Sequence, residues 1–180
     1  MIDNERKKEM LAAVRQHLEH RLKGAERPVL SDADIYREER GLFVTLHKHG
    51  DLRGCIGYIE GIKPLSQALF EMADAAAFRD PRFPSLQAEE LPETGIEISL
   101  LSPLKKVDSY RDIEIGKHGI VLKKGLNQAV FLPQVAPEQG WDLQTTLEHL
   151  CMKAGLPPDA WEKPDLEFRV FTAEVFSESS

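Results

Sequence analysis

Residues 41–59 read GLFVTLHKHGDLRGCIGYI, and this stretch decides the fold. Residues 42–47 are a run of apolar and β-branched side chains, Gly50-Asp51 is a turn signal, and residues 52–59 run back. Two such runs around a short turn that contains glycine are typical of a β-hairpin. The stretch therefore predicts two neighbouring antiparallel strands, and the second of them carries a cysteine between two glycines.

A helix and a strand are predicted after this hairpin. Pro64 can open the helix, because its fixed backbone angle suits a first helical turn. The apolar residues keep helical spacing until Arg79, namely Leu65, Ala68, Leu69, Met72 and Ala76. A proline-marked loop and a short helical turn near residues 85–90 follow. Isoleucine and leucine at positions 96, 98 and 100 then alternate with polar residues, which predicts a strand with one buried face.

The same order of elements returns in the second half of the chain. Residues 119–132, GIVLKKGLNQAVFL, predict a second hairpin. A second helix is expected between Asp142, a plausible cap, and Gly155, its stop. A closing strand is expected over residues 166–176. Two hairpin-helix-strand units predict an α+β fold with one shared, mainly antiparallel sheet.

The expected organisation is a single domain over residues 1–180. An N-terminal helix covers residues 3–22, where leucine and valine recur at steps of three and four. The first repeat covers about residues 41–104 and the second about residues 113–176. Such a pattern suggests an internal duplication. The alternative is a chance similarity, because this order of elements is common.

Composition excludes several classes of protein. The chain has 180 residues, of which 23 are Lys or Arg and 30 are Asp or Glu, so its formal charge is −7. That sign makes nucleic acid an unlikely partner. No apolar run is long enough to span a membrane and the N-terminus has no signal-type segment, so we expect no membrane association and a cytoplasmic location. Two cysteines without CxxC spacing do not form a disulfide framework.

Residues 52–57, LRGCIG, resemble the signature of the AMMECR1 domain family. Further segments match the family in order along most of the chain: FVTL at 43–46, DPRFP at 80–84, IEIGKHG at 113–119, LPQVA at 132–136, GWD at 140–142, LEHLC at 147–151 and KAGLP at 153–157. The resemblance implies an α+β fold with a barrel-like sheet built from two repeats, in agreement with the duplication expected from the residues.

The resemblance also implies a place in a larger system. In prokaryotes the domain is similar to component A of a three-part system, with a Memo-like protein and a radical SAM enzyme as partners. The Memo-like protein is itself similar to extradiol dioxygenases. No biochemical activity is established for the family, so the resemblance implies a partner role or a modification pathway without naming a reaction. No motif in the chain indicates a cofactor.

Cys55 is the candidate catalytic residue. Gly54 and Gly57 flank it and would let a ligand come close, while Arg53 would hold an anion near the thiol and favour the thiolate. The alternative is a packed cysteine, since cysteine is often buried and glycines in strands often mark close packing. His118, just before the second hairpin, is a weaker candidate for a base, and its alternative role is to cap the strand start.

Histidines raise the question of a metal site. His47 and His49 share one face if both lie on a strand, and with Cys55 nearby a metal site can be drawn. A two-residue turn at Gly50-Asp51 would place Leu46 opposite Cys55 and direct both histidines away, whereas a three-residue turn would bring them together. Exposed histidines are the preferred interpretation, so we expect no metal.

A second pair of possible metal ligands lies on the predicted helix after Asp142. His149 and Cys151 point in different directions on a helix, which rejects that pair as a ligand set. Cys151 lies among the apolar positions of its helix and is expected to flank the core.

The loop at residues 79–84 is the candidate binding segment. It places Asp80, Arg82 and Phe83 on a chain stiffened by two prolines, and such side chains are good anchors for a partner. The alternative is structural, with Phe83 in the core and Arg82 in an ion pair.

Two functions follow from these residues. In the first, the protein is an accessory or binding component whose cleft near Arg53, Cys55 and the loop receives a partner's chain terminus or a small polar or anionic ligand. In the second, it is an enzyme that uses Cys55 as a nucleophile or redox thiol. Nucleic-acid binding is a third and weaker candidate, because the lysines are sparse.

Overall fold

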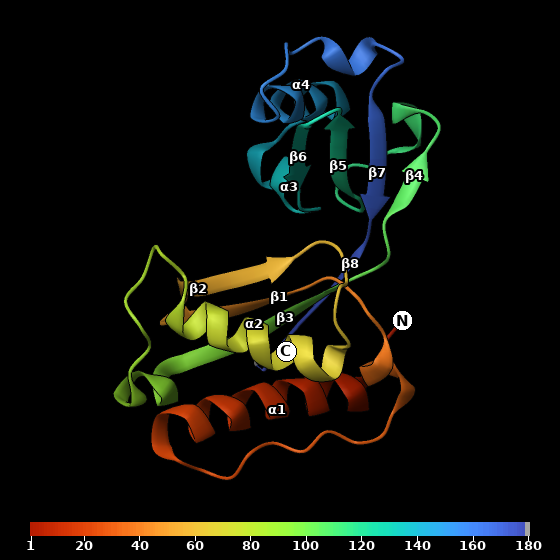
Figure 1. Cartoon of the computed structure of the whole chain (residues 1–180). Helices are drawn as coiled ribbons and strands as arrows, with labels where there is room; N and C mark the ends of the chain where they lie inside the picture. Colours follow the sequence, from red (N-terminus) through yellow and green to blue (C-terminus); the bar gives the residue numbers. More distant parts are fainter. Residues whose placement is uncertain (179–180) are drawn as a thin grey trace. The chain divides into compact units, whose positions relative to one another are not determined.

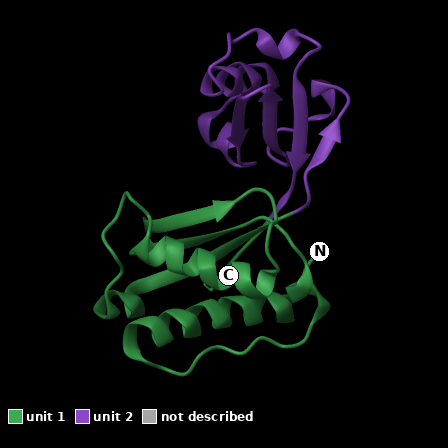
Figure 2. Ribbon diagram, in the orientation of Figure 1, with its two compact units in different colours: residues 1–101, 174–180 green, residues 102–173 purple. Residues whose placement is uncertain are grey.

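The structure is a computed structural model that describes residues 1–178. It divides into two compact units, coloured separately in Figure 2. Unit 1 comprises residues 1–101 and the C-terminal segment from residue 174, and unit 2 comprises residues 102–173. Each unit has its own sheet and its own hydrophobic core. The single domain over residues 1–180 stays a prediction, and residues 179 and 180 of that range lie outside the described part.

Unit 1 is a four-stranded sheet with helices packed on one face (Figure 1). The strand order is β2-β1-β3-β8, so β2 and β8 are the edge strands. The elements are α1 (Asn4–Lys23), the 3-10 helix η1 (Asp34–Arg37), β1 (Leu42–Lys48), β2 (Asp51–Tyr58), α2 (Leu65–Phe78), the 3-10 helix η2 (Ala88–Glu93), β3 (Thr94–Leu101) and β8 (Ala173–Ser177).

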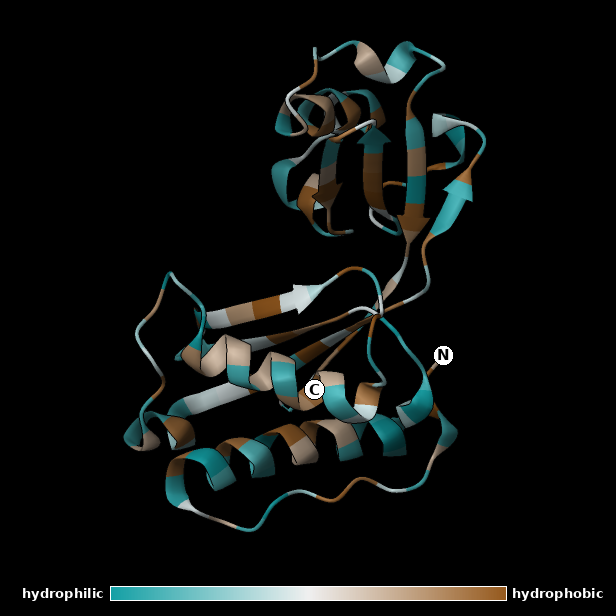
Figure 3. Cartoon of the chain, viewed as in Figure 1, coloured by the Kyte–Doolittle hydropathy of each residue, from teal (hydrophilic) through white to brown (hydrophobic). Residues whose placement is uncertain are grey.

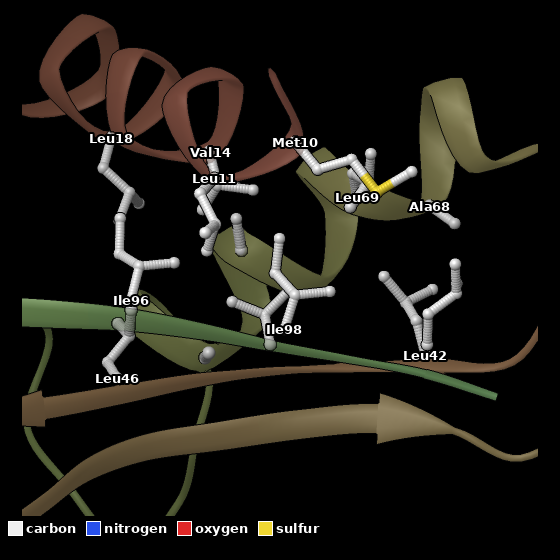
Figure 4. Packing of buried hydrophobic residues seen from close by; sticks show 14 of the residues in the cluster. Met10, Leu11, Val14, Leu18, Leu42, Leu46, Ala68, Leu69, Ile96 and Ile98 are labelled. Carbon is white, nitrogen blue, oxygen red and sulfur yellow. The ribbon is translucent and has the colours of Figure 1, made fainter. Parts of the chain in front are cut away.

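The N-terminal helix, predicted over residues 3–22, covers residues 4–23. The Asp3 side chain accepts a hydrogen bond from the backbone N–H of Arg6, which satisfies one of the free donors of the first turn. Gly24 ends the helix in the left-handed conformation, and its N–H bonds to the His20 carbonyl. Figure 4 shows the apolar face of α1 directed toward the sheet, with α2 beside it. The buried residues drawn there include Met10, Val14, Leu18, Leu42, Leu46, Leu69, Ile96 and Ile98.

The register of the first hairpin differs from the expected one. The turn consists of His49 and Gly50, both with positive φ, so Lys48 pairs with Asp51. A bulge between Leu46 and His47 then shifts the pairing, and Thr45 rather than Leu46 lies opposite Cys55. The predicted pairing of Leu46 with Cys55 is wrong because the turn lies one residue earlier than expected, which moves the pairing by two positions, and the bulge, which leaves Arg53 unpaired, moves it back by only one.

Unit 2 repeats the architecture with a smaller core. Its strand order is β4-β7-β5-β6. Figure 3 colours β5 mostly brown, as expected for the buried run GIVL, and the short β4 mostly teal. The elements are β4 (Lys105–Val107), the 3-10 helix η3 (Tyr110–Asp112), β5 (Gly119–Lys124), β6 (Asn127–Phe131), α3 (Val135–Gln139), α4 (Leu143–Lys153), the 3-10 helix η4 (Ala160–Glu162) and β7 (Glu167–Phe171).

The two sheets share one topology. In each, the first hairpin strand lies between its partner and the last strand of the repeat, giving β2-β1-β3 and β6-β5-β7. The fourth strand of each sheet follows the last strand of the other repeat, because β4 comes after β3 and β8 comes after β7. The α+β class, the antiparallel pairing and the N-terminal helix are confirmed. The one shared sheet is not, since the strands form two separate sheets.

The predicted closing strand over residues 166–176 is two strands in different sheets. The break falls at Thr172, whose backbone O accepts from the Ser102 N–H at 2.9 Å and whose N–H donates to the Ser102 hydroxyl at 2.8 Å. Residues 166–176 contain no glycine or proline, so the sequence gives no turn signal at this position. No helix within residues 1–178 has the length and apolar character needed to cross a lipid bilayer.

Candidate functional site

The signature LRGCIG forms most of edge strand β2, and its two glycines are explained by packing. A Cβ at Gly54 would lie 2.1 Å from the backbone O of Ala76, so α2 approaches the strand directly there. A Cβ at Gly57 would lie 2.5 Å from Cγ of Phe43, whose ring occupies that space. Both positions therefore require glycine because protein atoms, rather than a ligand, come close.

Asp80 holds the backbone of Cys55 at the free edge of the sheet. Its Oδ2 accepts the Cys55 N–H at 3.0 Å, and Nη2 of Arg82 donates to the Cys55 carbonyl at 3.3 Å. A carboxylate and a guanidinium thus take the outward backbone groups that a further strand would otherwise bind. This arrangement closes part of an edge that is otherwise open to strand pairing.

Asp80 is itself buried, with a residue exposure of 4%. Arg82 donates to it three times, from its backbone N–H, from Nε and from Nη2, at 3.1, 3.0 and 2.7 Å. The Arg82 hydrogen bond is the main cause that holds the pKa of Asp80 far below its usual range, although burial opposes it. The carboxylate is therefore ionised and fully engaged, and it is no free base for the thiol.

The Cys55 thiol is half-buried and has one close polar neighbour. Its Sγ lies 3.2 Å from Oγ1 of Thr45 on the facing strand. A threonine hydroxyl does not remove a proton at neutral pH, so this contact supplies no general base. Among residues 1–178 no histidine or carboxylate side chain is hydrogen-bonded to the thiol.

Arg53 forms a second ion pair, with Glu90 of η2. Its Nε and Nη2 donate to the two carboxylate oxygens of Glu90 at 3.0 and 3.1 Å, and Lys48 approaches the same carboxylate at 3.2 Å. The hydrogen bond from Arg53, aided by Gln87 and Lys48, lowers the pKa of Glu90 to about 2. Only 9% of the Arg53 side chain is exposed.

Phe83 lies beside both arginines. Its ring centroid is 6.0 Å from Cζ of Arg53 and 5.5 Å from Cζ of Arg82, which are cation–π distances. The ring is half-buried, whereas 55% of the Arg82 side chain is exposed. The structure therefore brings together Arg53, Cys55 and the loop residues Asp80, Arg82 and Phe83 within unit 1.

The remaining candidates lie elsewhere. His47 lines a surface hollow with Glu97, and His49 in the turn is 3.5 Å from Glu93. Within residues 1–178 no three potential metal ligands of the His, Cys, Asp or Glu type come together. His118 belongs to unit 2, where its Nδ1 accepts a hydrogen bond from the Glu114 N–H. That bond closes the turn of residues 114–118, so both roles considered for His118 stay predictions.

The helical pair in unit 2 is structural. Cys151 is fully buried in the core of unit 2, and burial raises the pKa of its thiol. His149 stacks on Trp141 with ring centroids 4.0 Å apart and bonds through Nδ1 to the Thr145 carbonyl at 2.8 Å. Cys151 is therefore the core-flanking residue that the sequence predicts.

Three residues of the site are missing from the sequence-based prediction: Thr45, Lys48 and Glu90. Thr45 and Lys48 depend on the hairpin register, which the bulge alters. Glu90 has a local signal, because Gln87 and Glu90 have capping-box spacing and the Gln87 N–H donates to the Glu90 carboxylate at 2.9 Å. That signal identifies the turn but not the arginine that the carboxylate binds.

Known proteins place the chain in a family. The model of the AMMECR1 family matches residues 11–176. A protein of Methanothermobacter thermautotrophicus is 43% identical over 177 residues, covering 94% of this chain and 92% of that protein. A protein of Methanopyrus kandleri is 51% identical over 150 residues, with coverages of 78% and 72%.

A solved structure agrees with this relationship. The crystal structure of an uncharacterized protein from Pyrococcus horikoshii matches with a TM-score of 0.82 and 34% identity, over 98% of this chain and 93% of that one. The signature in β2, the α+β architecture and the match along almost the whole chain point the same way: this chain belongs to the AMMECR1 family.

Proposed function

We propose that the protein is an accessory or binding component that acts with a Memo-like protein and a radical SAM enzyme in a modification pathway. The choice of partners is supported by the family resemblance. The choice of binding over catalysis is supported by one observation: Asp80 ties the loop of residues 80–84 to the backbone of Cys55, while Arg82 stays largely exposed beside Phe83.

This arrangement suits recognition for a physical reason. The loop is stiffened by two prolines and fixed at Asp80 by four hydrogen bonds, so little conformational entropy is lost when a partner binds. Arginine and aromatic side chains contribute strongly to protein interfaces. By contrast, the Cys55 thiol has Thr45 as its polar neighbour and no base, so a thiol enzyme is the less supported alternative.

The test is a binding measurement on the purified chain with the Memo-like protein and the radical SAM enzyme of the same organism. We expect Arg82→Ala to weaken the complex about tenfold, as truncation of an interface arginine typically does. Arg37→Ala is the matched control, because Arg37 is exposed and pairs with Asp34 in η1, outside the candidate binding segment of residues 79–84. Equal effects of both variants, or no complex at all, would contradict the proposal.

Cys55→Ser distinguishes the two functions in cells. If the protein binds partners, a deletion strain complemented with Cys55→Ser keeps the modification that the wild-type chain supports. If the thiol reacts with a substrate, the modification is lost although the variant protein folds and accumulates normally. The second outcome would favour the enzyme.

A further inference from the structure

Each unit has a hairpin whose second strand lies at the edge of its sheet, β2 in unit 1 and β6 in unit 2. In an antiparallel sheet every second residue of such a strand directs its backbone N–H and C=O away from the sheet. These groups can pair with a strand of another molecule, which is how exposed edges lead to association. β2 has eight residues and β6 has five, so each offers more than one outward residue.

The outward residues of β6 are Gln128 and Val130. Lys124 pairs with Asn127 across the two-residue turn at 125–126, and the residues on either side of such a turn are hydrogen-bonded to each other. Bonded and non-bonded pairs alternate from there along the two strands. The backbone groups of Gln128 and Val130 therefore do not bind β5, and they face away from the sheet.

A lysine from the next helix binds one of these outward groups. Lys153 is the last residue of α4, and its Nζ donates to the Val130 carbonyl at 2.8 Å. The same Nζ lies 5.0 Å from the centroid of the Phe131 ring, a cation–π distance that helps to hold the side chain along the edge. A strand that pairs with β6 at Val130 would have to displace this charged group.

The loop directly after α2 has the same role in unit 1. Asp80 accepts the Cys55 N–H at 3.0 Å and Arg82 donates to the Cys55 carbonyl at 3.3 Å, so both outward groups of Cys55 are bound. Only 1% of the Asp80 side chain is exposed, and its 2.7 Å ion pair with Arg82 holds the two side chains together. In each repeat, charged side chains at the end of the helix or just beyond it thus bind the outer backbone of the hairpin.

We propose that Lys153 and the Asp80–Arg82 pair are edge guards, which prevent β6 and β2 from pairing with the same strand of a second copy of this chain. Charged side chains at an edge strand oppose pairing, because an incoming strand must displace and desolvate them. A second copy is the competitor because two identical strands form a symmetric antiparallel pair, so each copy presents the surface that the other needs. The guards concern this chain alone and do not depend on the partner proteins proposed above.

The test in unit 2 removes the guard and compares self-association by sedimentation velocity of the whole protein over a range of concentrations. Lys153→Ala frees the Val130 carbonyl, so we expect self-association about tenfold tighter than in the wild type, because backbone hydrogen bonds to a second strand become available. Lys117→Ala is the matched control. It removes the same charge from a side chain that is 60% exposed and paired with Glu114, and it should leave self-association unchanged.

A second substitution shows whether the association uses the strand edge. Gln128→Pro removes the neighbouring outward N–H, a change that an edge strand tolerates because this group makes no bond within the sheet. Added to Lys153→Ala, it should return self-association to the wild-type level, while thermal unfolding shows that the double variant still folds. Association that persists in the folded double variant would show that it does not occur through β6, and would overturn the guard role of Lys153.

The test in unit 1 is Arg82→Ala, which frees the Cys55 carbonyl. We expect self-association about tenfold tighter for the same reason, and slower amide hydrogen exchange at Gly57 as the protein concentration rises, because a second strand would cover this next outward residue. Arg37→Ala is the charge-matched control, since its side chain is 72% exposed and pairs with Asp34.

Each guard is overturned by a variant that folds and yet associates no more than its charge-matched control. The unit 2 variants leave Asp80 and Arg82 unchanged, so they decide the proposal even if Arg82→Ala fails to fold. All of these measurements use the chain without partners, and a failure of the partner proteins to bind would not alter them.

Discussion

Asp80 illustrates how one residue organises the site. It begins the loop of residues 80–84 that follows α2, and its one buried carboxylate fixes the backbone of Cys55 and aligns Arg82. The sequence does show the loop motif DPRFP, but it does not show that the carboxylate binds a strand 25 residues earlier. Long-range contacts of this kind depend on the register of β2, which no local pattern reveals.

Removing this carboxylate should destabilise unit 1. Asp80→Ala leaves the part-buried Cys55 N–H without this acceptor and Arg82 without its carboxylate partner, so we expect the free energy of unfolding to fall by about 2 kcal/mol. Asp34→Ala is the control, because its side chain is 96% exposed and paired only with Arg37. That variant should change stability by less than about 0.5 kcal/mol. Urea unfolding monitored by circular dichroism measures both, and equal losses would refute the role of Asp80.

The lowered pKa values of the Asp80 and Glu90 carboxyl groups predict that the stability of the folded protein depends on pH. Asp80 and Glu90 bind protons less readily in the folded than in the unfolded protein, because Arg82 and Arg53 stabilise their ionised forms. Their contribution to the free energy of unfolding is complete above the pKa of about 4 that these groups have in the unfolded chain. It is lost as the pH falls through the pKa values of the folded protein, which is about 2 for Glu90. Unfolding curves from pH 6 down to pH 2 should show this loss, and Glu90→Gln should reduce the slope.

The two cysteines should differ in reactivity. Cys151 is fully buried and burial raises the pKa of its thiol, whereas Cys55 is half-buried on an edge strand. Iodoacetamide should therefore modify Cys55 well before Cys151 in the native protein. Mass spectrometry of tryptic peptides over time measures the two rates. Equal rates under native conditions would show that the burial of Cys151 is not maintained in solution.

At the scale of elements, the signature hexapeptide is mainly a contact between a strand and a helix. The Ala76 carbonyl of α2 occupies the space next to Gly54 that any larger side chain would need. This close approach brings the end of α2, and with it Asp80, within reach of β2. The catalytic interpretation of the flanking glycines is therefore less favoured than their packing role.

Gly54→Ala tests this contact directly. The added Cβ would lie 2.1 Å from a backbone oxygen, so strand and helix must separate, and we expect a loss of about 3 kcal/mol in unfolding free energy. Gly95→Ala is the matched control on β3, since the nearest atom to its Cβ would be 4.0 Å away. Thermal unfolding of the two variants measures the difference, and a tolerated Gly54→Ala would show that α2 shifts freely.

Elements were predictable where local signals exist. The cap Asp142 and the proline before α2 stand at the predicted places, whereas the turn of the first hairpin lies one residue earlier than predicted. Two short elements were not predicted. β4 (Lys105–Val107) has only three residues, too few to show an alternation of apolar and polar side chains. α3 contains Pro137, which interrupts the pattern of a helix. The break at Thr172 was not predicted either, because residues 166–176 contain no glycine or proline to mark the end of a strand.

At the scale of the whole molecule, unit 2 is one continuous segment whereas unit 1 is not. All four strands of the unit 2 sheet lie between residues 105 and 171, while the unit 1 sheet needs β8 from the end of the chain. The duplication expected from the sequence is supported by the matching strand orders. The number of sheets was not predictable, because hydropathy patterns specify which face is buried and not which strand pairs with which.

A fragment of residues 102–173 should therefore fold without the rest of the chain. It contains every strand of its sheet and the core residues Leu122, Leu147, Leu150 and Phe168. We expect cooperative thermal unfolding and dispersed NMR signals from the isolated fragment. A fragment of residues 1–101 lacks β8 and should be less stable than the complete unit 1. A disordered 102–173 fragment would show that unit 2 depends on unit 1.

The position of β8 reverses the order in which the units are completed during synthesis. A ribosome makes most of unit 1 first, yet the sheet of that unit keeps β3 as an unpaired edge until residues 173–177 emerge. Unit 2, encoded later, has all its strands before that moment. A nascent chain thus carries an open strand edge through the translation of more than seventy residues, the interval in which cellular chaperones would meet it.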